Sequence, residues 1–255
     1  MLSQDNKETE WLLTEKYAGV KTEAFYADCK RLALGEPLAY LIGWTPFLNS
    51  KIWLDNRPLI PRPETEYWVN EAIGTIRKST ISLGLDQTSP KILDLCAGSG
   101  CVGVSILKEI EDSRVDFAEI DSNLIPTITK NIKENKIEQS RTEVLHSNLF
   151  SKVEGTYDFI LSNPPYIDES LNRADKSVKD FEPYVALFGG EDGMEIINQI
   201  ITEAHKHLSP GGQIWLEHEP EQIHKIADVA DENGFSASIH KDQYQIDRYS
   251  ILVLQ

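Results

Sequence analysis

The chain has 255 residues, 40% of them hydrophobic and 26% charged, a balance that suits one large domain or a small domain beside a larger one. Its 25 Lys and Arg against 41 Asp and Glu give a net charge of −16. That charge argues against sequence-independent nucleic-acid binding, which needs a basic surface. The first ten residues are polar and no apolar stretch reaches the length of a membrane span. We therefore expect a cytoplasmic protein without a signal peptide, acting as a monomer.

Cysteines and histidines give no pattern of a metal site. The three cysteines, Cys29, Cys96 and Cys101, lack the spacing of metal ligands, and we expect reduced thiols. The histidines are scattered along the chain, at His146, His205, His207, His218, His224 and His240. His218 follows a predicted strand, so it either lines a cleft or is simply a polar strand end. The five tryptophans are expected in the core or at a domain interface.

The first part of the chain is helical in pattern. Over residues 1–41, apolar residues recur at helical spacing until the Gly35-Glu36-Pro37 break. Residues 42–63 are expected to form a linker with a short hairpin over 45–54 that turns at Asn49 and Ser50. A helix is then predicted over residues 64–78, its early acids suiting the positive helix end, and a loop over 79–90. The remaining domain would span residues 64–255.

From Lys91 onward, apolar strand-like runs alternate with helical segments. Strands are predicted over residues 91–95, 114–120, 142–146, 157–162, 212–217, 236–241 and 250–254. Helices are predicted over residues 102–110, 124–135, 193–208 and 219–233. This alternation predicts an α/β domain with a parallel sheet. No helix separates the last two strands, so one of them should run antiparallel.

The tetrapeptide Asn163-Pro164-Pro165-Tyr166 closes the apolar run 157–162. Open α/β sheets place their chemistry at the carboxyl ends of the strands, and two prolines stiffen the backbone there. The side-chain oxygen of Asn163 and the neighbouring Pro164 carbonyl can together accept two hydrogen bonds from one planar NH₂ group. Tyr166 adds an aromatic face that can cover a planar amide or base. An ordinary proline-rich turn is the alternative for the tetrapeptide taken alone.

A second site is indicated by the glycine-rich segment Cys96-Ala97-Gly98-Ser99-Gly100, which follows the first predicted strand and opens a helix. Nineteen residues past Gly100, Glu119 ends the second strand, where an acid can take ribose hydroxyls. Asp121 is the competing ribose ligand, although Ser122 and Asn123 make it look like part of the following turn. The loop lacks the glycine spacing of a dinucleotide site and the Lys of a phosphate loop. A nucleoside cofactor without pyrophosphate fits best, and S-adenosylmethionine is such a molecule.

Three further features leave alternatives open. Asn148, just past the third strand, is placed either to meet the adenine edge or to form a turn. Arg62 lies between two prolines, where it either reaches the cofactor carboxylate and shapes the cleft or pairs with Glu64 or Glu66. Residues 168–191 directly follow the tetrapeptide and have little periodicity, so they form either a flexible substrate loop or a surface insertion.

From about Gly35 to the C terminus, the chain resembles the HemK/PrmC family of protein-(glutamine N5) methyltransferases, which modify the Gly-Gly-Gln loop of class I peptide chain release factors. The resemblance is carried by residues 35–37, 60–66, 94–100, 147–150, 163–166, 181–183, 193–194 and 216–218. The Asn-Pro-Pro-Tyr motif is shared with adenine-N6 methyltransferases. The segment Pro-Arg-Pro-Glu-Thr-Glu at 61–66, together with Phe-Glu-Pro at 181–183, is more particular to the glutamine enzymes.

The resemblance implies a Rossmann-like, seven-stranded methyltransferase sheet behind a small helical N-terminal domain, and S-adenosylmethionine as the cofactor. Cofactor contacts would come from the loop 96–100, from the ribose acid and from the adenine side, and the glutamine substrate would be held by the tetrapeptide. In this chain the implied residues are Cys96, Ala97, Gly98, Ser99, Gly100, Glu119, Asn148 or Leu149, Asn163, Pro164, Pro165 and Tyr166. The chain departs from the family pattern at Cys96-Ala97, Glu119 and Asn148, and its helical N-terminal part is short.

An amide nitrogen is a poor nucleophile, so catalysis would rest on positioning. Asn163 and Pro164 are the expected catalytic residues, because their oxygens would hold the amide protons and aim the nitrogen at the sulfonium methyl. Adenine-N6 methylation of RNA or DNA is the main competing hypothesis, against which the net charge of −16 argues. Methylation of a glutamine in a ribosomal protein stays open as well, and a catalytically silent binding module is the hypothesis least favoured by the intact motifs.

Overall fold

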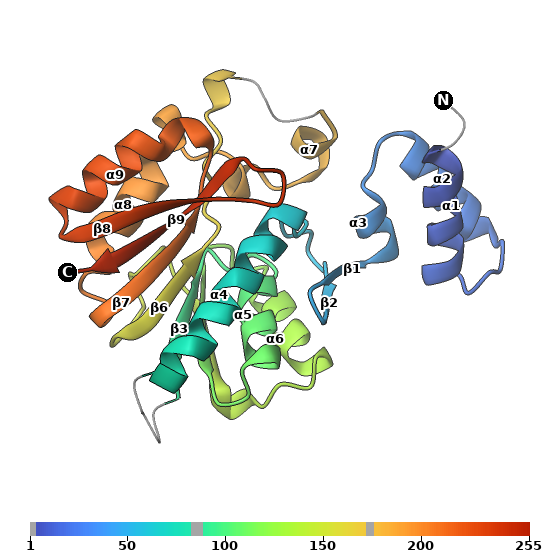
Figure 1. Ribbon diagram of the computed structural model, residues 1–255. Coiled ribbons are helices and arrows are strands. Elements are labelled where there is room, and N and C mark those ends of the chain that lie inside the picture. The colour runs from blue at the N-terminus through green and yellow to red at the C-terminus, as the bar shows by residue number, and fades with distance from the viewer. Residues whose placement is uncertain (1–3, 83–88, 172–175) are drawn as a thin grey trace.

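A computed structural model of the protein describes residues 4–82, 89–171 and 176–255. Its centre is a seven-stranded sheet of order β5-β4-β3-β6-β7-β9-β8 (Figure 1). The strands are β3 (Lys91–Leu95), β4 (Arg114–Glu119), β5 (Thr142–His146), β6 (Tyr157–Ser162), β7 (Leu208–Glu217), β8 (Phe235–Lys241) and β9 (Asp247–Leu254). The strands β3 to β7 pair in parallel, whereas β9 runs antiparallel to both of its neighbours. The predicted α/β class and the single reversed strand are confirmed.

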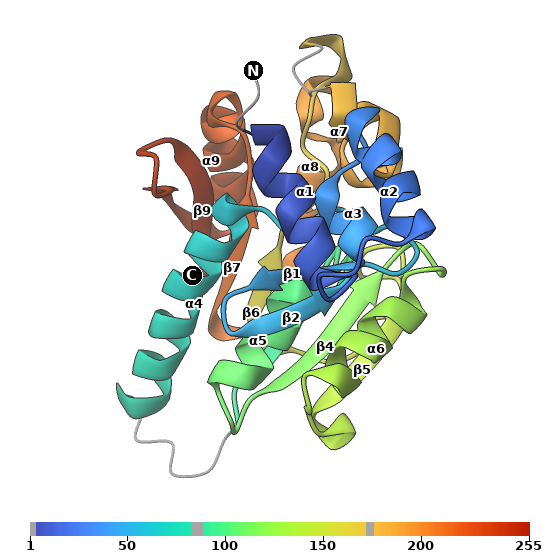
Figure 2. The same ribbon diagram turned by 90° about the vertical axis from the view of Figure 1, so that its right-hand side faces the viewer.

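Helices cover both faces of the sheet and make a three-layer domain (Figures 1 and 2). On one face lie α4 (Pro63–Ser82), α5 (Cys101–Glu109) and α6 (Ile125–Glu134), and on the other α8 (Glu195–Ala204) and α9 (Ile223–Glu232). Successive strand residues point to opposite faces, so Ile92 packs in the first core and Leu93 in the second. The strands are therefore continuous apolar runs, which made them visible in the sequence.

The N-terminal helices α1 (Gln4–Glu15), α2 (Glu23–Ala33) and α3 (Leu38–Ile42) form a separate group beside the sheet domain (Figure 1). They enclose a small core of Leu12, Phe25 and Leu41. Trp11 was expected in a core or interface, but 64% of it is exposed, because Leu12 is the residue that points inward. The division of the chain at residues 41 and 63 stays a prediction.

The hairpin of β1 (Trp44–Phe47) and β2 (Ser50–Trp53) joins the two parts of the chain. It is anchored by the fully buried Asn131 of α6, whose side chain accepts a hydrogen bond from the Trp53 N–H at 2.7 Å. The same side chain donates to the carbonyls of Trp53 at 3.0 Å and of Ser99 at 2.8 Å. The hairpin is thereby tied to the glycine-rich loop of the sheet domain.

Several predicted boundaries were wrong. The helix predicted over residues 64–78 runs on to Ser82, so only part of the predicted loop 79–90 is loop, and residues 83–88 lie outside the described ranges. The helix predicted over 193–208 ends at Ala204, because Leu208 already pairs with Tyr157 in the sheet. Short helical segments lie between the longer elements: the 3₁₀ helices η1 (Gln139–Arg141), η2 (Glu169–Leu171), η3 (Tyr184–Ala186), η4 (Glu191–Gly193) and η5 (Pro220–Gln222), and the short α-helix α7 (Lys176–Phe181). In the described ranges no helix is long and apolar enough to cross a membrane.

Candidate active site

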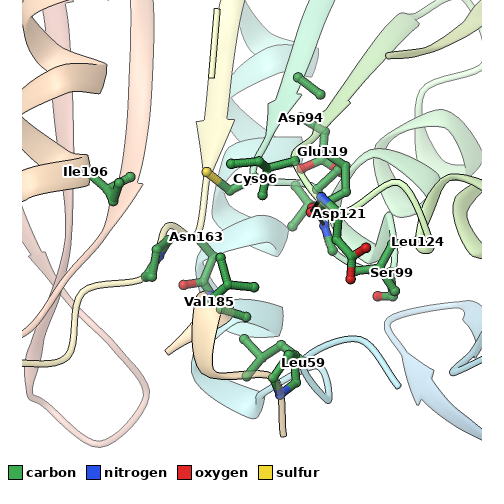
Figure 3. Close-up of a pocket in the computed structure, with 18 of the residues that line it drawn as sticks. Leu59, Asp94, Cys96, Ser99, Glu119, Asp121, Leu124, Asn163, Val185 and Ile196 are labelled. Atoms are coloured by element: carbon green, nitrogen blue, oxygen red, sulfur yellow. Dashed lines mark hydrogen bonds between the residues drawn. The ribbon is translucent and has the colours of Figure 1, made fainter. Parts of the chain in front are cut away.

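The carboxyl ends of three adjacent strands meet at one edge of the sheet. Leu95 of β3 pairs with Ala118 of β4 on one side and with Ser162 of β6 on the other. The next residue of each strand, Cys96, Glu119 or Asn163, therefore emerges at the same edge. These three residues line a cavity of about 280 Å³ (Figure 3). The register of the sheet thus joins the two sites that the sequence suggested separately.

The glycine-rich loop turns sharply because three of its residues have left-handed backbone conformations. Cys96, Gly98 and Gly100 have φ of 62°, 56° and 77°. Asp94 of β3 joins the two ends of the loop, because its buried carboxylate accepts a hydrogen bond from the Gly103 N–H of α5 at 2.9 Å. Burial raises the pKa of Asp94 to about 8. The motif residue Asp94 thus fixes the loop and is also part of the cavity wall, a role that its sequence position had not suggested.

Glu119 is held by two backbone groups. One carboxylate oxygen accepts from the Gly98 N–H at 2.7 Å and the other from the Asp121 N–H at 2.8 Å. Only 6% of Glu119 is exposed, and burial raises its pKa. Each oxygen keeps a lone pair for a further donor, and the side chain faces the cavity (Figure 3). The carboxylate is therefore preorganised to accept hydroxyl groups.

Asp121 also borders the cavity, but its carboxylate is engaged in its own turn. It accepts hydrogen bonds from the Asn123 backbone at 2.9 Å and from the Asn123 side chain at 2.8 Å. This is the turn-and-cap geometry suggested by the neighbouring sequence.

Most of the predicted cofactor residues gather around this first cavity. It is bordered by Arg62, Cys96, Ala97, Gly98, Ser99, Glu119, Asn148, Leu149 and Asn163. Gly100 does not border it; it begins α5 and packs behind the loop, where a Cβ would lie 3.1 Å from Ile128. Apolar side chains from distant segments complete the wall, among them Leu59, Leu124, Val185 and Ile196 (Figure 3). No local motif marked these four, because each is an ordinary apolar residue brought in by tertiary packing.

A second cavity of about 420 Å³ lies on the other side of Asn163. Of the tetrapeptide, Asn163, Pro164 and Tyr166 border this second cavity, whereas Pro165 faces the first. Only a few residues border both cavities: Leu59, Arg62, Asn163 and Ala186. Asn163 is thus at the junction of the two spaces. Within the described ranges, neither its Oδ1 nor the Pro164 carbonyl oxygen receives a hydrogen bond from another residue.

The tetrapeptide is held from behind by the segment that follows it. A Cβ at Gly189 would lie 2.5 Å from the Pro165 carbonyl oxygen, and one at Gly193 would lie 1.9 Å from that of Tyr166. Both positions therefore require glycine for the backbones to approach so closely. Gln222 adds a hydrogen bond to the Tyr166 carbonyl at 2.9 Å. Part of the segment 168–191 is consequently packed against the turn, while residues 172–175 of it lie outside the described ranges.

Arg62 has neither of the ion-pair partners proposed from the sequence. Its guanidinium donates to Glu182 at 2.6 Å, and the second oxygen of Glu182 accepts from the Ile60 N–H at 3.1 Å. Glu66 instead accepts from the Leu48 N–H at 2.5 Å. The pairing with Glu64 or Glu66 was wrong because the Phe-Glu-Pro segment, 120 residues away, folds back onto the start of α4. Arg62 does border both cavities, so the expectation that it shapes the cleft is consistent with its position.

His218 lies inside the protein and borders neither cavity. Its ring contacts the Ser250 hydroxyl at 2.8 Å and the Glu219 carbonyl at 2.9 Å, and burial lowers its pKa to about 4. Of the two roles considered for His218, the polar strand end is the one observed. Among the described residues no group of His, Cys, Asp or Glu could hold a metal ion. Burial raises the pKa of Cys96 and Cys101 to about 12, so neither thiol is poised as a thiolate.

An open α/β sheet with one reversed strand, and with a cavity at the carboxyl ends of its central strands, is the architecture expected of a methyltransferase. Comparison with known proteins agrees. A family model described as "Methyltransferase small domain" matches residues 81–181. A solved methyltransferase structure from Pyrococcus furiosus superposes with a TM-score of 0.56 at 19% identity, covering 89% of this chain and 97% of that one.

Relatives of known name define the family more narrowly. A release factor glutamine methyltransferase from Rhodopirellula baltica is 36% identical over 220 residues, covering 85% of this chain and 73% of the relative. Another, from Lactococcus lactis, is 32% identical over 241 residues, covering 93% and 84%. The chain belongs to the family of release factor glutamine methyltransferases.

Proposed function

We propose that this enzyme transfers a methyl group from S-adenosylmethionine to the side-chain amide nitrogen of the glutamine in the Gly-Gly-Gln motif of class I peptide chain release factors. The observation that carries the proposal is the position of Asn163, whose side chain borders both cavities. One cavity suits the cofactor and the other the acceptor, and the amide-binding group lies where they meet. The names of the relatives support the choice of substrate.

The residues of the first cavity fit S-adenosylmethionine. The anchored Glu119 carboxylate would accept the ribose hydroxyls, and Asn148 and Leu149 would border the adenine. The loop 96–99 would bring its backbone close to the cofactor, while Gly100 supports that loop from behind. The cofactor supplies a methyl group on a positively charged sulfur, which an acid-rich protein accommodates well.

Asn163 and Pro164 would bind the acceptor amide. The Asn163 Oδ1 and the Pro164 carbonyl oxygen would each accept a hydrogen bond from the glutamine NH₂ group, which would aim the nitrogen lone pair toward the first cavity. Positive charge would develop on the nitrogen as it takes the methyl group from the sulfonium, and the two oxygens would stabilise that charge. One amide proton then leaves to solvent. Tyr166 would hold the side chain in place through its ring.

The charge of the second cavity favours a protein substrate over a nucleic acid. Its border carries six acids, Glu64, Asp168, Asp192, Glu217, Glu219 and Glu221. Its two cations are Arg62, which pairs with Glu182 at 2.6 Å, and Arg248, which lies 3.4 Å from Glu219 and Asp242. Such a surface would repel phosphates, and its arginines are already engaged with carboxylates.

Side-by-side labelling tests the proposal. Release factor, ribosomal protein and nucleic acid are incubated separately with the enzyme and tritiated S-adenosylmethionine. Label is expected in the release factor and should vanish when the glutamine of its Gly-Gly-Gln motif is replaced by alanine. Faster labelling of nucleic acid, or of ribosomal protein, would overturn the proposed substrate.

A further inference from the structure

A buried carboxylate at the border of the second cavity supports the tetrapeptide. Glu217, at the end of β7, is only 1% exposed. One of its oxygens, Oε2, receives hydrogen bonds from the Thr65 hydroxyl and from the Trp68 indole N–H of α4, both at 2.7 Å. The other, Oε1, receives the Tyr166 hydroxyl at 2.9 Å. Thr65 in turn accepts a hydrogen bond from the side-chain Nδ2 of Asn163 at 3.0 Å. The carboxylate thus holds both ends of the tetrapeptide, Tyr166 directly and Asn163 through Thr65.

The donor and the acceptor of each hydrogen bond that links Trp68, Glu217, Thr65 and Asn163 follow from the chemistry of the side chains. As an ionised carboxylate, Glu217 can only accept, and its Oε2 atom accepts a hydrogen bond from the Trp68 indole N–H. The Thr65 hydroxyl shares that oxygen and therefore gives its only proton to Glu217. What remains on the Thr65 hydroxyl is its two lone pairs, which can only accept a hydrogen bond. The side chain of Asn163 must consequently turn its NH₂ group toward Thr65, which leaves its carbonyl oxygen on the opposite side.

We infer that Thr65 and Glu217 are positioning residues that set the orientation of the Asn163 amide, so that its oxygen and not its nitrogen meets the acceptor amide. The inference rests on the proposed role of Asn163. An asparagine amide is nearly symmetric in shape, so packing alone discriminates poorly between its two orientations. In the flipped orientation, the NH₂ group of Asn163 would face the NH₂ group of the substrate, and neither could accept. Glu217 and Thr65 exclude that orientation because a flipped amide would place its oxygen against the lone pairs of Thr65.

This assignment also gives a role to two sequence segments that carry the family resemblance without an evident function. Thr65 belongs to Pro-Arg-Pro-Glu-Thr-Glu and Glu217 to Leu-Glu-His. The two residues are 152 positions apart and are joined by a hydrogen bond that is entirely buried. Burial strengthens such bonds and makes an unpaired partner costly, so the network is rigid.

Thr65→Val is the main test, because valine keeps the shape of threonine and removes the hydroxyl. The single-turnover rate of methyl transfer, measured at saturating cofactor and substrate, is expected to fall roughly 10- to 100-fold, somewhat less than on removal of Asn163 itself. Thr65 also borders the first cavity, so cofactor affinity is measured separately by calorimetry. Thr65→Ser keeps the hydroxyl and should restore the rate to within about threefold of the wild type. The matched control is Thr127→Val. Thr127 is equally buried and donates a hydrogen bond to the Asp55 carbonyl at 2.7 Å, but it borders neither cavity. The methyl-transfer rate of Thr127→Val should therefore equal that of the wild type.

A double-mutant cycle separates positioning from a general effect on structure. In the Asn163→Ala background, Thr65→Val should cause almost no further loss, because Thr65 acts only through the Asn163 amide. Losses that multiply would overturn the inference, as would a Thr65→Val enzyme with the wild-type rate. If Asn163→Ala itself is fully active, the proposed mechanism fails rather than this inference alone.

Glu217→Gln provides a second variant should Thr65→Val fail to fold. The indole N–H of Trp68 would turn the glutamine oxygen toward itself and Thr65, and the glutamine NH₂ toward Tyr166, whose hydroxyl can accept. The polarity at Thr65 is then preserved, so the rate should fall less than tenfold. A loss greater than 100-fold in folded Glu217→Gln would mean that the charge and not the hydrogen-bond direction matters, and would overturn the inference.

Discussion

The two cavities that meet at Asn163 are built in different ways. The polar contacts that fix the glycine-rich loop of the first cavity are close in sequence: Glu119 accepts from the Gly98 N–H across 21 residues of chain, and Asp94 accepts from the Gly103 N–H across nine. The tetrapeptide beside the second is held by groups much farther away, since Asn163 contacts Thr65 across 98 residues and Thr65 contacts Glu217 across 152. The segment from β3 to β4 therefore fixes the glycine-rich loop and Glu119, and apolar residues from distant segments complete that cavity. The orientation of Asn163, by contrast, requires α4 and β7 to be packed against the tetrapeptide. Substitution of distant residues that pack against the tetrapeptide should therefore lower both the activity and the stability of the protein.

The largest effect is expected at the junction itself. Asn163→Ala should lower the single-turnover rate by roughly 10²–10³-fold, because one preorganised polar contact to the reacting amide is lost. Cofactor affinity must be measured separately by calorimetry, since Asn163 borders both cavities. Tyr166→Phe keeps the ring but removes the hydrogen bond to Glu217, so the rate should fall much less than in Asn163→Ala. Near-wild-type transfer by Asn163→Ala at saturating cofactor and substrate would refute the mechanism.

The long-range support of the turn can be tested at Gly193. Alanine there would place its Cβ 1.9 Å from the Tyr166 carbonyl oxygen at a φ of 67°, so the free energy of unfolding should fall by roughly 2–4 kcal/mol. The matched control is Gly211→Ala, which has a similar φ of 75° but open space around the Cβ and should cost only about 1 kcal/mol. Urea unfolding measures both. Equal losses would show that close approach to the tetrapeptide contributes nothing.

On the cofactor side the effect should be smaller and confined to binding. Glu119→Ala should weaken S-adenosylmethionine binding by roughly 1–3 kcal/mol in calorimetry, because the ribose hydroxyls lose a charged acceptor. Asp121→Ala is the natural comparison, since the Asp121 carboxylate is already bound to Asn123, and it should lose less. The opposite ranking would assign the ribose to Asp121.

Near neutral pH the smallest effect is expected at His218, which follows Glu217 in the chain. Burial lowers the pKa of His218 to about 4, below its value of about 6.5 in an unfolded chain, so between these values the unfolded state binds more protons. The stabilisation is complete above pH 6.5 and is lost as the pH falls toward 4, by up to about 1 kcal/mol per pH unit. Measured by urea unfolding at several pH values, the stability of the wild type relative to His218→Gln should decline in this window. A constant difference would mean that His218 titrates normally.

The same contrast between local and long-range contacts explains which predictions were accurate. All seven strands of the sheet were placed to within a few residues, because buried parallel strands are continuous apolar runs. The glycine-rich loop and Glu119 lie together as expected, because the register of two adjacent strands brings them there. Gly100 was expected to contact the cofactor but does not border the first cavity. A glycine in a loop indicates that something lies close to the backbone, but the sequence does not show whether that is a ligand or, as here, the side chain of Ile128.

The sequence by itself determined the order of strands and helices, the reversed strand, and the edge of the sheet at which Cys96, Glu119 and Asn163 emerge. Periodicity and short turns encode these features within a few tens of residues. Only the tertiary structure decided that Arg62 pairs with Glu182, that His218 is buried, and that Thr65 and Glu217 lie behind Asn163. Those contacts depend on how α4 and the segment after β6 pack on the sheet. Apolar spacing shows which face of a helix is buried, but not which distant polar group a side chain will meet there.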